Sequence, residues 1–248
     1  MLEFFDAKCM IGRRLRYREN GPKSNSDLIE LMDRCNIRQA MVFHSVAKEA
    51  DIRMGNKMVV EETVGDNRFF RQWCVVPNTK DDFFEPNQLV EEMKKHDVSS
   101  VRLYPKTFGH STQPYVLSSM MRAFAEHHVP VFVDADEVAG DTLYQICKDY
   151  SDTTFVVTHP DYGNSRWYYP VLKQCSNLYM GTSNYLDHNG IKEFTELFGA
   201  ERMIFETGLP VGSACAALSL VCYADINMED KQMIASGNMK RLLAEVCL

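Results

Sequence analysis

Eight short apolar segments, each followed by an amphipathic segment, are the feature that most limits the folds open to this chain. Most are nearly continuous hydrophobic runs such as VPVFVDA and TTFVVTH. This pattern is typical of strands in a parallel sheet that is covered on both faces. The eight segments are residues 2–7, 38–45, 69–77, 99–105, 129–135, 153–159, 177–183 and 202–207.

The segments between these strands have the spacing of amphipathic helices. Apolar residues recur at i, i+3, i+4 and i+7 within residues 28–35, 117–124 and 143–150, and SNSD at residues 24–27 supplies N-cap chemistry for the first helix. Strands alternating with helices over 248 residues predict one α/β domain, residues 1–248, with the (β/α)8 TIM-barrel fold. The alternative is an open doubly wound sheet. Its glycine-rich phosphate turn is not matched here, because KCMIGRR after the first strand holds a single glycine.

The composition narrows the class of protein. A net charge of −7 argues against a nucleic-acid partner, and we interpret the one basic run, with Arg13, Arg14, Arg16 and Arg18, as a solvated or anion-contacting loop. None of the eight cysteines forms a C-x-x-C pair. The N-terminus lacks the order of a signal peptide, and no apolar run approaches the roughly 20 residues that span a membrane. We expect a cytoplasmic protein without a membrane partner.

In a (β/α)8 barrel, chemistry occurs at the C-terminal ends of the strands. Most residues at these ends are polar, although the strands behind them are apolar. A charged group that is buried there must be paired or hydrogen-bonded, because burial of an isolated charge is costly. We therefore expect several of them to form one polar cluster. The residues at the strand ends are Asp6, Lys8, His44, Pro77, Arg102, Tyr104, Asp134, His159, Ser183 and Glu206.

Several segments resemble the amidohydrolase-related family, a group of metal-dependent hydrolases and decarboxylases. They occur in the family's order over nearly the whole chain and read FFDAKCMIG, VPVFVDADE, FVVTHPDYGN, ERMIFETGLP and GNMKRLLAEV, while VRLYP is similar to the family's fourth strand. The family pattern has D-x-H-x-H in the first strand, a histidine closing the fifth, a histidine after the sixth and an aspartate after the eighth. The resemblance implies a TIM barrel that hydrolyses or decarboxylates small molecules.

This sequence departs from the family pattern at most of the metal-binding positions, and only His159 is retained. The substituted positions are Lys8, Met10, Asp134 and Gly208. A catalytic zinc ion needs about three protein ligands. His159 and Asp134 supply two, so we expect a degenerate metal site and no metal cofactor; a zinc or manganese ion, if bound, would use these two residues. We expect the Lys8 ammonium to replace part of the missing charge by pairing with Asp134 or Glu206.

Several functions stay open on these residues. The first is a protein without a metal centre that binds a small polar or anionic ligand, either as a pseudoenzyme or with hydrolase- or lyase-type activity. A second makes Lys8 a nucleophile, a third is a metal-dependent hydrolase with an atypical ligand set, and a fourth is a non-enzymatic interaction protein. Trp167 and the YYP that follows it suggest a homodimer interface or helix packing.

Roles follow from the position of each residue at the predicted barrel mouth. Lys8, Asp134 and His159 are the predicted catalytic residues, and no residue is assigned to a metal. The alternative for His44, Arg102 and Ser183 is a structural role as a rim histidine, an ion-pair partner and a turn cap. The predicted substrate-binding residues are His44, Arg102, Tyr104, Ser183 and Glu206.

Overall fold

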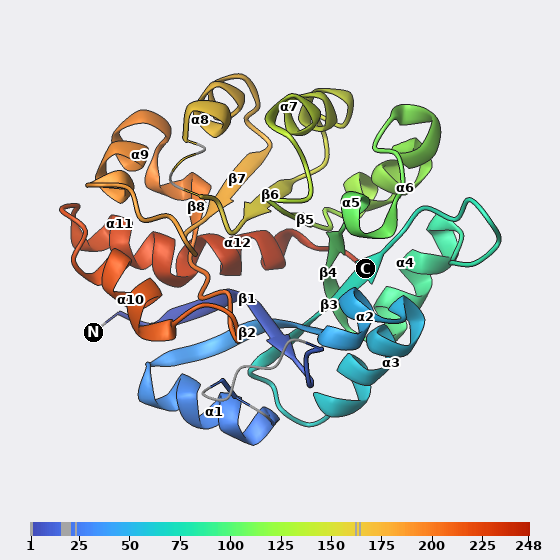
Figure 1. The fold of residues 1–248 in the computed structure, drawn as a ribbon, viewed down its shortest axis with the longest axis horizontal. Coiled ribbons are helices and arrows are strands. Elements are labelled where there is room, and N and C mark those ends of the chain that lie inside the picture. The colour runs from blue at the N-terminus through green and yellow to red at the C-terminus, as the bar shows by residue number, and fades with distance from the viewer. Residues whose placement is uncertain (1, 16–20, 23, 162, 164) are drawn as a thin grey trace.

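The computed structural model is an eight-stranded parallel barrel surrounded by helices (Figure 1). It describes residues 2–15, 21–22, 24–161, 163 and 165–248. Each strand pairs with the next along the chain, which confirms the predicted TIM barrel. The strands are β1 (Phe4–Ile11), β2 (Ile37–His44), β3 (Phe69–Val75), β4 (Val98–Leu103), β5 (Val131–Asp134), β6 (Phe155–Thr158), β7 (Leu178–Gly181) and β8 (Met203–Ile204).

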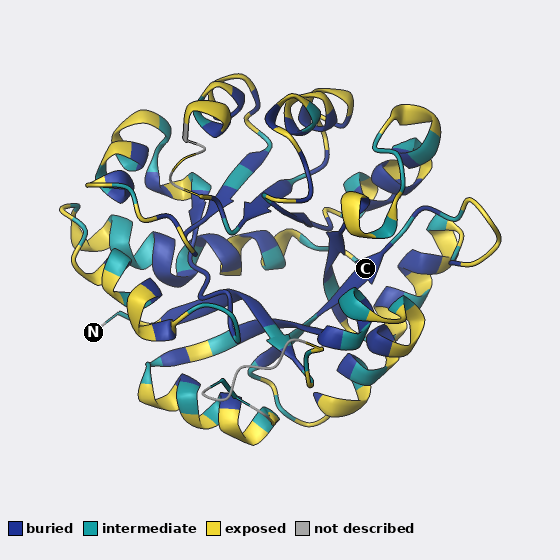
Figure 2. Cartoon of the chain, viewed as in Figure 1, coloured by how far each residue is buried: buried dark blue, intermediate teal, exposed yellow. Residues whose placement is uncertain are grey.

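Helices follow the strands and form the outer ring, in which dark blue buried faces turn toward the strands (Figure 2). The first helix begins as predicted, because Ser24 and Asp27 form a reciprocal capping box. No helix in the described part of the chain is long and apolar enough to cross a membrane. The helices are α1 (Asn25–Arg34), α2 (Ser45–Glu49), α3 (Ile52–Glu62), α4 (Pro86–Lys95), α5 (Pro105–Phe108), α6 (Pro114–Glu126), α7 (Gly140–Asp149), α8 (Ser165–Gln174), α9 (Gly190–Phe198), α10 (Ala214–Cys222), α11 (Met228–Gln232) and α12 (Asn238–Glu245), with a 3₁₀ turn η2 (Ala200–Arg202) and a π-helical turn η3 (Met233–Gly237).

Hydrogen bonds join β1 to the segment that follows β8. The backbone N–H of Met10 donates to the carbonyl of Leu209 at 2.9 Å. Asp6 is fully buried, and its carboxylate accepts from the backbone N–H of Thr207 at 2.9 Å and from the Thr207 hydroxyl at 2.5 Å. Asp6 therefore stabilises the seam between β1 and the segment after β8.

Most of the strand boundaries differ from the predicted ones by one to four residues, and the largest differences are at the ends of β1 and β8. β1 continues to Ile11, beyond the predicted end at residue 7, because Cys9, Met10 and Ile11 still pair with β2; Lys8 is buried inside the strand with its charge paired. β8 is confined to Met203–Ile204, shorter than the predicted 202–207, because its ladder with β7 comprises these two residues and only an isolated bridge at Leu209 joins the following segment to β1.

The two ends of the barrel have different interiors. At the end where the strands begin, the side chains of Phe5, Phe132 and Val156 pack against Met239 and Leu242 of α12, which closes that end. Apolar burial at this end supplies stability, at about 25 cal/mol per Å² of apolar surface removed from water. The opposite end, where the strands finish, holds the buried polar side chains.

The basic run after β1 is only partly described. Arg16 and Arg18 lie outside the described residues. Arg14 is described, and its Nε donates to Glu49 of α2 at 2.9 Å. The segment after β1 is therefore tied to the helix after β2, next to the end of the barrel that holds the polar side chains.

Candidate functional site

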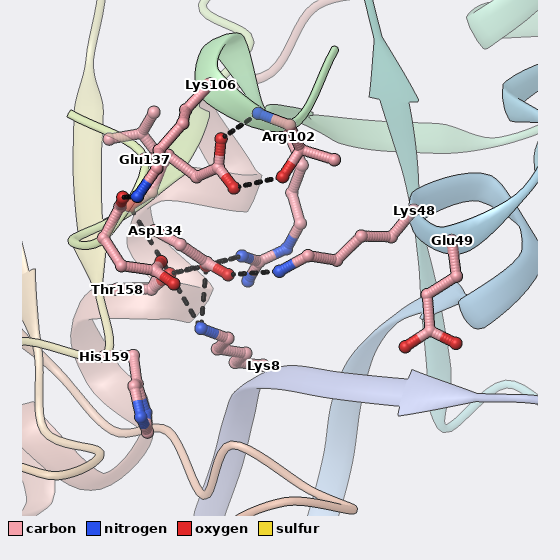
Figure 3. A network of polar contacts seen from close by, with 12 residues as sticks. Lys8, Lys48, Glu49, Arg102, Lys106, Asp134, Glu137, Thr158 and His159 are labelled. Atoms are coloured by element: carbon pink, nitrogen blue, oxygen red, sulfur yellow. Dashed lines mark hydrogen bonds and ion pairs between the residues drawn. The ribbon is translucent and has the colours of Figure 1, made fainter. Parts of the chain in front are cut away.

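One buried carboxylate holds three cations at the C-terminal ends of the strands (Figure 3). Asp134 closes β5, and its Oδ1 accepts from Lys8 Nζ at 2.7 Å and from Arg102 Nη1 at 2.8 Å. Its Oδ2 accepts from Lys48 Nζ at 3.0 Å. The hydroxyl of Thr158 also donates to Oδ1, at 2.5 Å. The predicted pairing of Lys8 with a carboxylate is confirmed, and Asp134 is the partner.

Arg102 lies beneath this carboxylate. Its Nε donates to the side chain of Gln72. Its guanidinium carbon lies 4.7 Å from the ring centre of Phe43 and 5.4 Å from that of Phe132, a cation–π arrangement. The exposed fraction of Arg102 is 0%, so its guanidinium is enclosed by protein and its polar partners are Gln72, Asp134, Thr158 and the carbonyl of Ala7.

Lys48 is a site residue that the sequence analysis missed. It lies on the short helix α2, its side chain is 23% exposed, and its ammonium lies 4.2 Å from the ring centre of Tyr104. α2 begins directly after β2 ends at His44. Helical side chains tilt toward the helix N-terminus, so a lysine four residues after the strand end turns back toward the barrel axis. That spacing was the signal that could have identified Lys48.

The charges of the cluster shift the pKa values of its members. Burial alone would raise the pKa of Asp134, but Lys8, Arg102 and Lys48 together hold that pKa well below its usual range. Burial lowers the pKa of Lys8, and the charge of Arg102 adds to that effect, while Asp134 and Glu206 oppose it. Asp134 is therefore ionised at neutral pH, and Lys8 loses its proton more readily than an exposed lysine does.

A second polar group lies beside the first and contains His159, Ser183 and Glu206. Glu206 is fully buried, and its Oε1 accepts from the backbone N–H of His159 at 2.6 Å and from the Ser183 hydroxyl at 2.8 Å. The Ser183 oxygen lies 3.1 Å from His159 Nδ1. Burial raises the pKa of Glu206, and burial followed by the charge of Lys8 lowers the pKa of His159. The imidazole is therefore neutral at neutral pH.

Two predicted substrate-binding residues have other surroundings. Tyr104 is fully buried beneath Lys48, its hydroxyl makes no hydrogen bond to the described residues, and burial raises its pKa well above the usual value. His44 caps α2, because its Nδ1 accepts from the backbone N–H of Val46 at 3.1 Å, and its Nε2 lies 3.3 Å from a Glu62 oxygen. In the described part of the chain, the polar contacts of the His44 ring are with these two residues and do not include Asp134.

Gly208 occupies the position at which the family pattern has an aspartate after the eighth strand. Gly208 has a φ of +69°, a left-handed conformation that favours glycine, and a Cβ placed there would lie 3.6 Å from His159 Nδ1. The described residues contain no group of three or more histidine, cysteine, aspartate or glutamate side chains arranged to hold a metal ion. The site therefore consists of a cation cluster around Asp134 and a neighbouring imidazole held by Ser183 and Glu206.

A closed parallel (β/α)8 barrel with ionisable groups gathered at the ends of its strands defines the chain as a TIM-barrel protein. The family model described as Amidohydrolase matches residues 23–244, and this chain belongs to that family. A comparison with curated protein sequences found no match.

Solved structures share the fold at low sequence identity. An uncharacterized TIM-barrel protein from Bordetella bronchiseptica is 16% identical with a TM-score of 0.76, covering 98% of this chain and 99% of that one. 5-Carboxyvanillate decarboxylase from Sphingomonas paucimobilis is 12% identical with a TM-score of 0.73, covering 100% of both chains. A 2,6-dihydroxybenzoate decarboxylase in complex with 2,6-dihydroxybenzoate is 13% identical with a TM-score of 0.75, covering 98% of this chain and 100% of that one.

Proposed function

We propose that this member of the amidohydrolase family binds a small organic anion at the Asp134 cluster and does so without a catalytic metal ion. The observation that carries the proposal is the set of three cations around a single carboxylate. Asp134 balances one of these positive charges, so the cluster keeps an excess that attracts an anion. Lys48 is the most exposed of the three, so its ammonium is the group that an entering anion contacts first.

The donor atoms present do not fit the metal site of the family. Both oxygens of Asp134 already accept from cations, and His159 Nδ1 is engaged by Ser183. A divalent ion placed at Asp134 would also lie within a few ångströms of the Lys8 ammonium and would be repelled by it. The positive charge of Lys8 takes the part that a metal ion would take in neutralising Asp134.

The names of structural neighbours support an organic anion as the ligand. Two of them are named as decarboxylases of carboxylated aromatic compounds. A carboxylate is the kind of group that lysine ammonium ions bind. In this chain, His159 would move the proton in a hydrolase- or lyase-type reaction, because its imidazole is neutral and partly exposed beside Lys8 and Asp134.

The binding experiment uses 2,6-dihydroxybenzoate as the anionic probe and resorcinol, which lacks the carboxylate, as the neutral probe. Isothermal titration in the presence of EDTA should detect the anion only, with affinity that falls as salt rises. Lys48→Gln should weaken anion binding by roughly tenfold, the size expected when one charge-assisted bond is lost. Lys57→Gln is the matched control, since Lys57 is 75% exposed on the outer surface of α3.

Two results would reject the proposal. One is equal affinity for resorcinol and 2,6-dihydroxybenzoate. The other is a stoichiometric metal ion in the purified protein together with loss of anion binding in EDTA, which would establish the metal-dependent alternative.

One observation favours a second candidate function, in which Lys8 is a nucleophile toward a carbonyl substrate. Lys8 is 9% exposed, and burial and Arg102 lower its pKa, which are the conditions for an amine nucleophile. Its Nζ would attack a carbonyl carbon, and loss of water would leave an imine. Borohydride reduction with pyruvate as the probe should attach the adduct to the peptide containing Lys8. An adduct confined to exposed lysines such as Lys57 would reject this role.

A further inference from the structure

One oxygen of Glu206 controls both the backbone and the side chain of His159. His159 has a φ of +56°, in the left-handed region that residues other than glycine seldom adopt. Its backbone N–H donates to Glu206 Oε1 at 2.6 Å. The Ser183 hydroxyl donates to the same oxygen and is itself hydrogen-bonded to the imidazole of His159. Strained backbone of this kind is found where the surrounding structure holds a functional group in place.

The direction of the hydrogen bonds determines the tautomer of the imidazole. Glu206 Oε1 already accepts from a backbone N–H, and it accepts from the Ser183 hydroxyl as well. Because the Ser183 hydrogen is used in that bond, its oxygen acts as an acceptor toward His159 Nδ1 at 3.1 Å. The hydrogen of the neutral ring therefore lies on Nδ1, and Nε2 keeps a free lone pair.

This assignment applies to the ionised form of Glu206, in which Oε1 can only accept hydrogen bonds. Oε2 is buried and has no hydrogen-bond partner among the described residues, so it does not compete for the Ser183 hydroxyl. The tautomer is therefore measured at high pH, which favours the carboxylate.

A glycine makes room for the controlling carboxylate. A Cβ at Gly181, the last residue of β7, would lie 2.2 Å from Glu206 Oε1 and 2.3 Å from its Cδ. Any side chain at position 181 would push the carboxylate out of its place. Gly181 therefore offers a way to disturb the position of Glu206 without removing a hydrogen-bonding group.

We propose that Ser183 and Glu206 are positioning residues that hold His159 as the Nδ1–H tautomer and keep Nε2 free to accept a proton from a bound ligand. The sequence analysis placed both residues in contact with substrate; their bonds assign them instead to the support of His159. The inference rests on the acid–base role given to His159 in the proposed function, but the tautomer itself exists without any ligand.

The experiment is two-bond ¹H–¹⁵N correlation NMR of the histidine rings at pH 8 on the full chain, with His159 assigned by loss of its signals in His159→Gln. The wild type should show the Nδ1–H tautomer. Ser183→Ala should shift the ring toward Nε2–H, the ordinary preference of a free neutral histidine, while Ser183→Thr, which keeps a hydroxyl, should retain Nδ1–H. Signals of His127, which bonds to the Cys247 carbonyl, serve as the internal control for an intact fold.

A second pair of variants tests Glu206. Gly181→Ala should move the tautomer ratio in the same direction as Ser183→Ala, whereas Glu206→Gln should keep Nδ1–H because its amide oxygen can accept both bonds. An Nε2–H tautomer in the wild type, or an unchanged Nδ1–H tautomer in a folded Ser183→Ala variant, would overturn the inference. Because no ligand is present in the sample, this result is independent of whether 2,6-dihydroxybenzoate binds.

Discussion

Asp134→Asn removes one negative charge from the centre of the cluster without changing the size of the side chain. Lys8, Arg102 and Lys48 lie 2.7, 2.8 and 3.0 Å from the carboxylate, and the side chains of the first two are 11% and 0% exposed. Lys48 can turn toward solvent, so the cost arises mainly from the two buried cations that lose their partner. Removing one member of a buried ion pair costs about 3–5 kcal/mol.

That loss is large for a domain of this size. The free energy of unfolding of such domains is about 5–15 kcal/mol. Each kcal/mol of lost stability lowers the melting temperature of a chain of this length by about 2–4 °C. We expect Asp134→Asn to lower the melting temperature by roughly 10 °C or more. Urea unfolding followed by circular dichroism measures the free energy directly, and Asp82→Asn, at an exposed position, is the matched control.

The effect should depend on pH in a defined direction. The pKa of Asp134 is well below 3.8 in the folded protein, so its ionised form stabilises the fold. This contribution is complete above the unfolded pKa and is lost as pH falls from there toward the folded value. The difference between wild type and Asp134→Asn should therefore be constant above about pH 5 and shrink below pH 4.

The same variant should change anion binding in the opposite sense. With the carboxylate gone, the three cations attract an anion more strongly, so a folded Asp134→Asn protein should bind 2,6-dihydroxybenzoate more tightly than the wild type. A loss of stability below about 1 kcal/mol would refute the account of the buried cluster, since that is the range of an exposed ion pair. Weaker anion binding by the folded variant would refute the role of its positive charge.

Three further predictions concern stability. Because the pKa of Glu206 is raised above 4.5, wild-type stability should decline as pH rises through the interval above 4.5, and Glu206→Gln should abolish that decline in urea unfolding across pH 4.5–8. Asp6→Ala leaves the two Thr207 donors at the barrel seam without their acceptor and should cost about 3 kcal/mol, measured by the same unfolding assay. Gly12→Ala places a Cβ 2.3 Å from His44 Nε2 at a φ of +80° and should lower the melting temperature by several degrees, whereas Gly65→Ala, with the same left-handed φ and open space around it, should cost only the backbone strain.

The polar strand ends identified much of the site because the fold brings the ends of parallel strands to one face. Lys8 and Asp134 are separated by 126 residues, yet their contact could be expected because Lys8 directly follows the first predicted strand and Asp134 lies at the end of the fifth. His159, Ser183 and Glu206 also meet, as residues that follow neighbouring strands β6, β7 and β8. For these residues, hydrophobic periodicity and position in the sequence were sufficient to predict that they lie at the same end of the barrel.

Residues whose roles depend on helix placement could not be assigned in this way. Lys48 reaches Asp134 across 86 residues because α2 begins without a connecting loop, and a strand-end search excludes helical residues. His44 is polar and closes a strand, but its ring is used as the cap of α2. Arg102 also lies near the end of a strand, but its side chain is fully buried.

The sequence by itself determined the parallel barrel, the family and the face on which chemistry can occur, because hydrophobic periodicity and polar strand ends are local properties of the chain. Tertiary structure alone decided that Asp134 is shared by three cations and that one oxygen of Glu206 holds His159. Such sharing depends on distances of a few ångströms between side chains from different strands and helices. Those distances are set only when the barrel closes and each buried charge takes the partner that lies within reach.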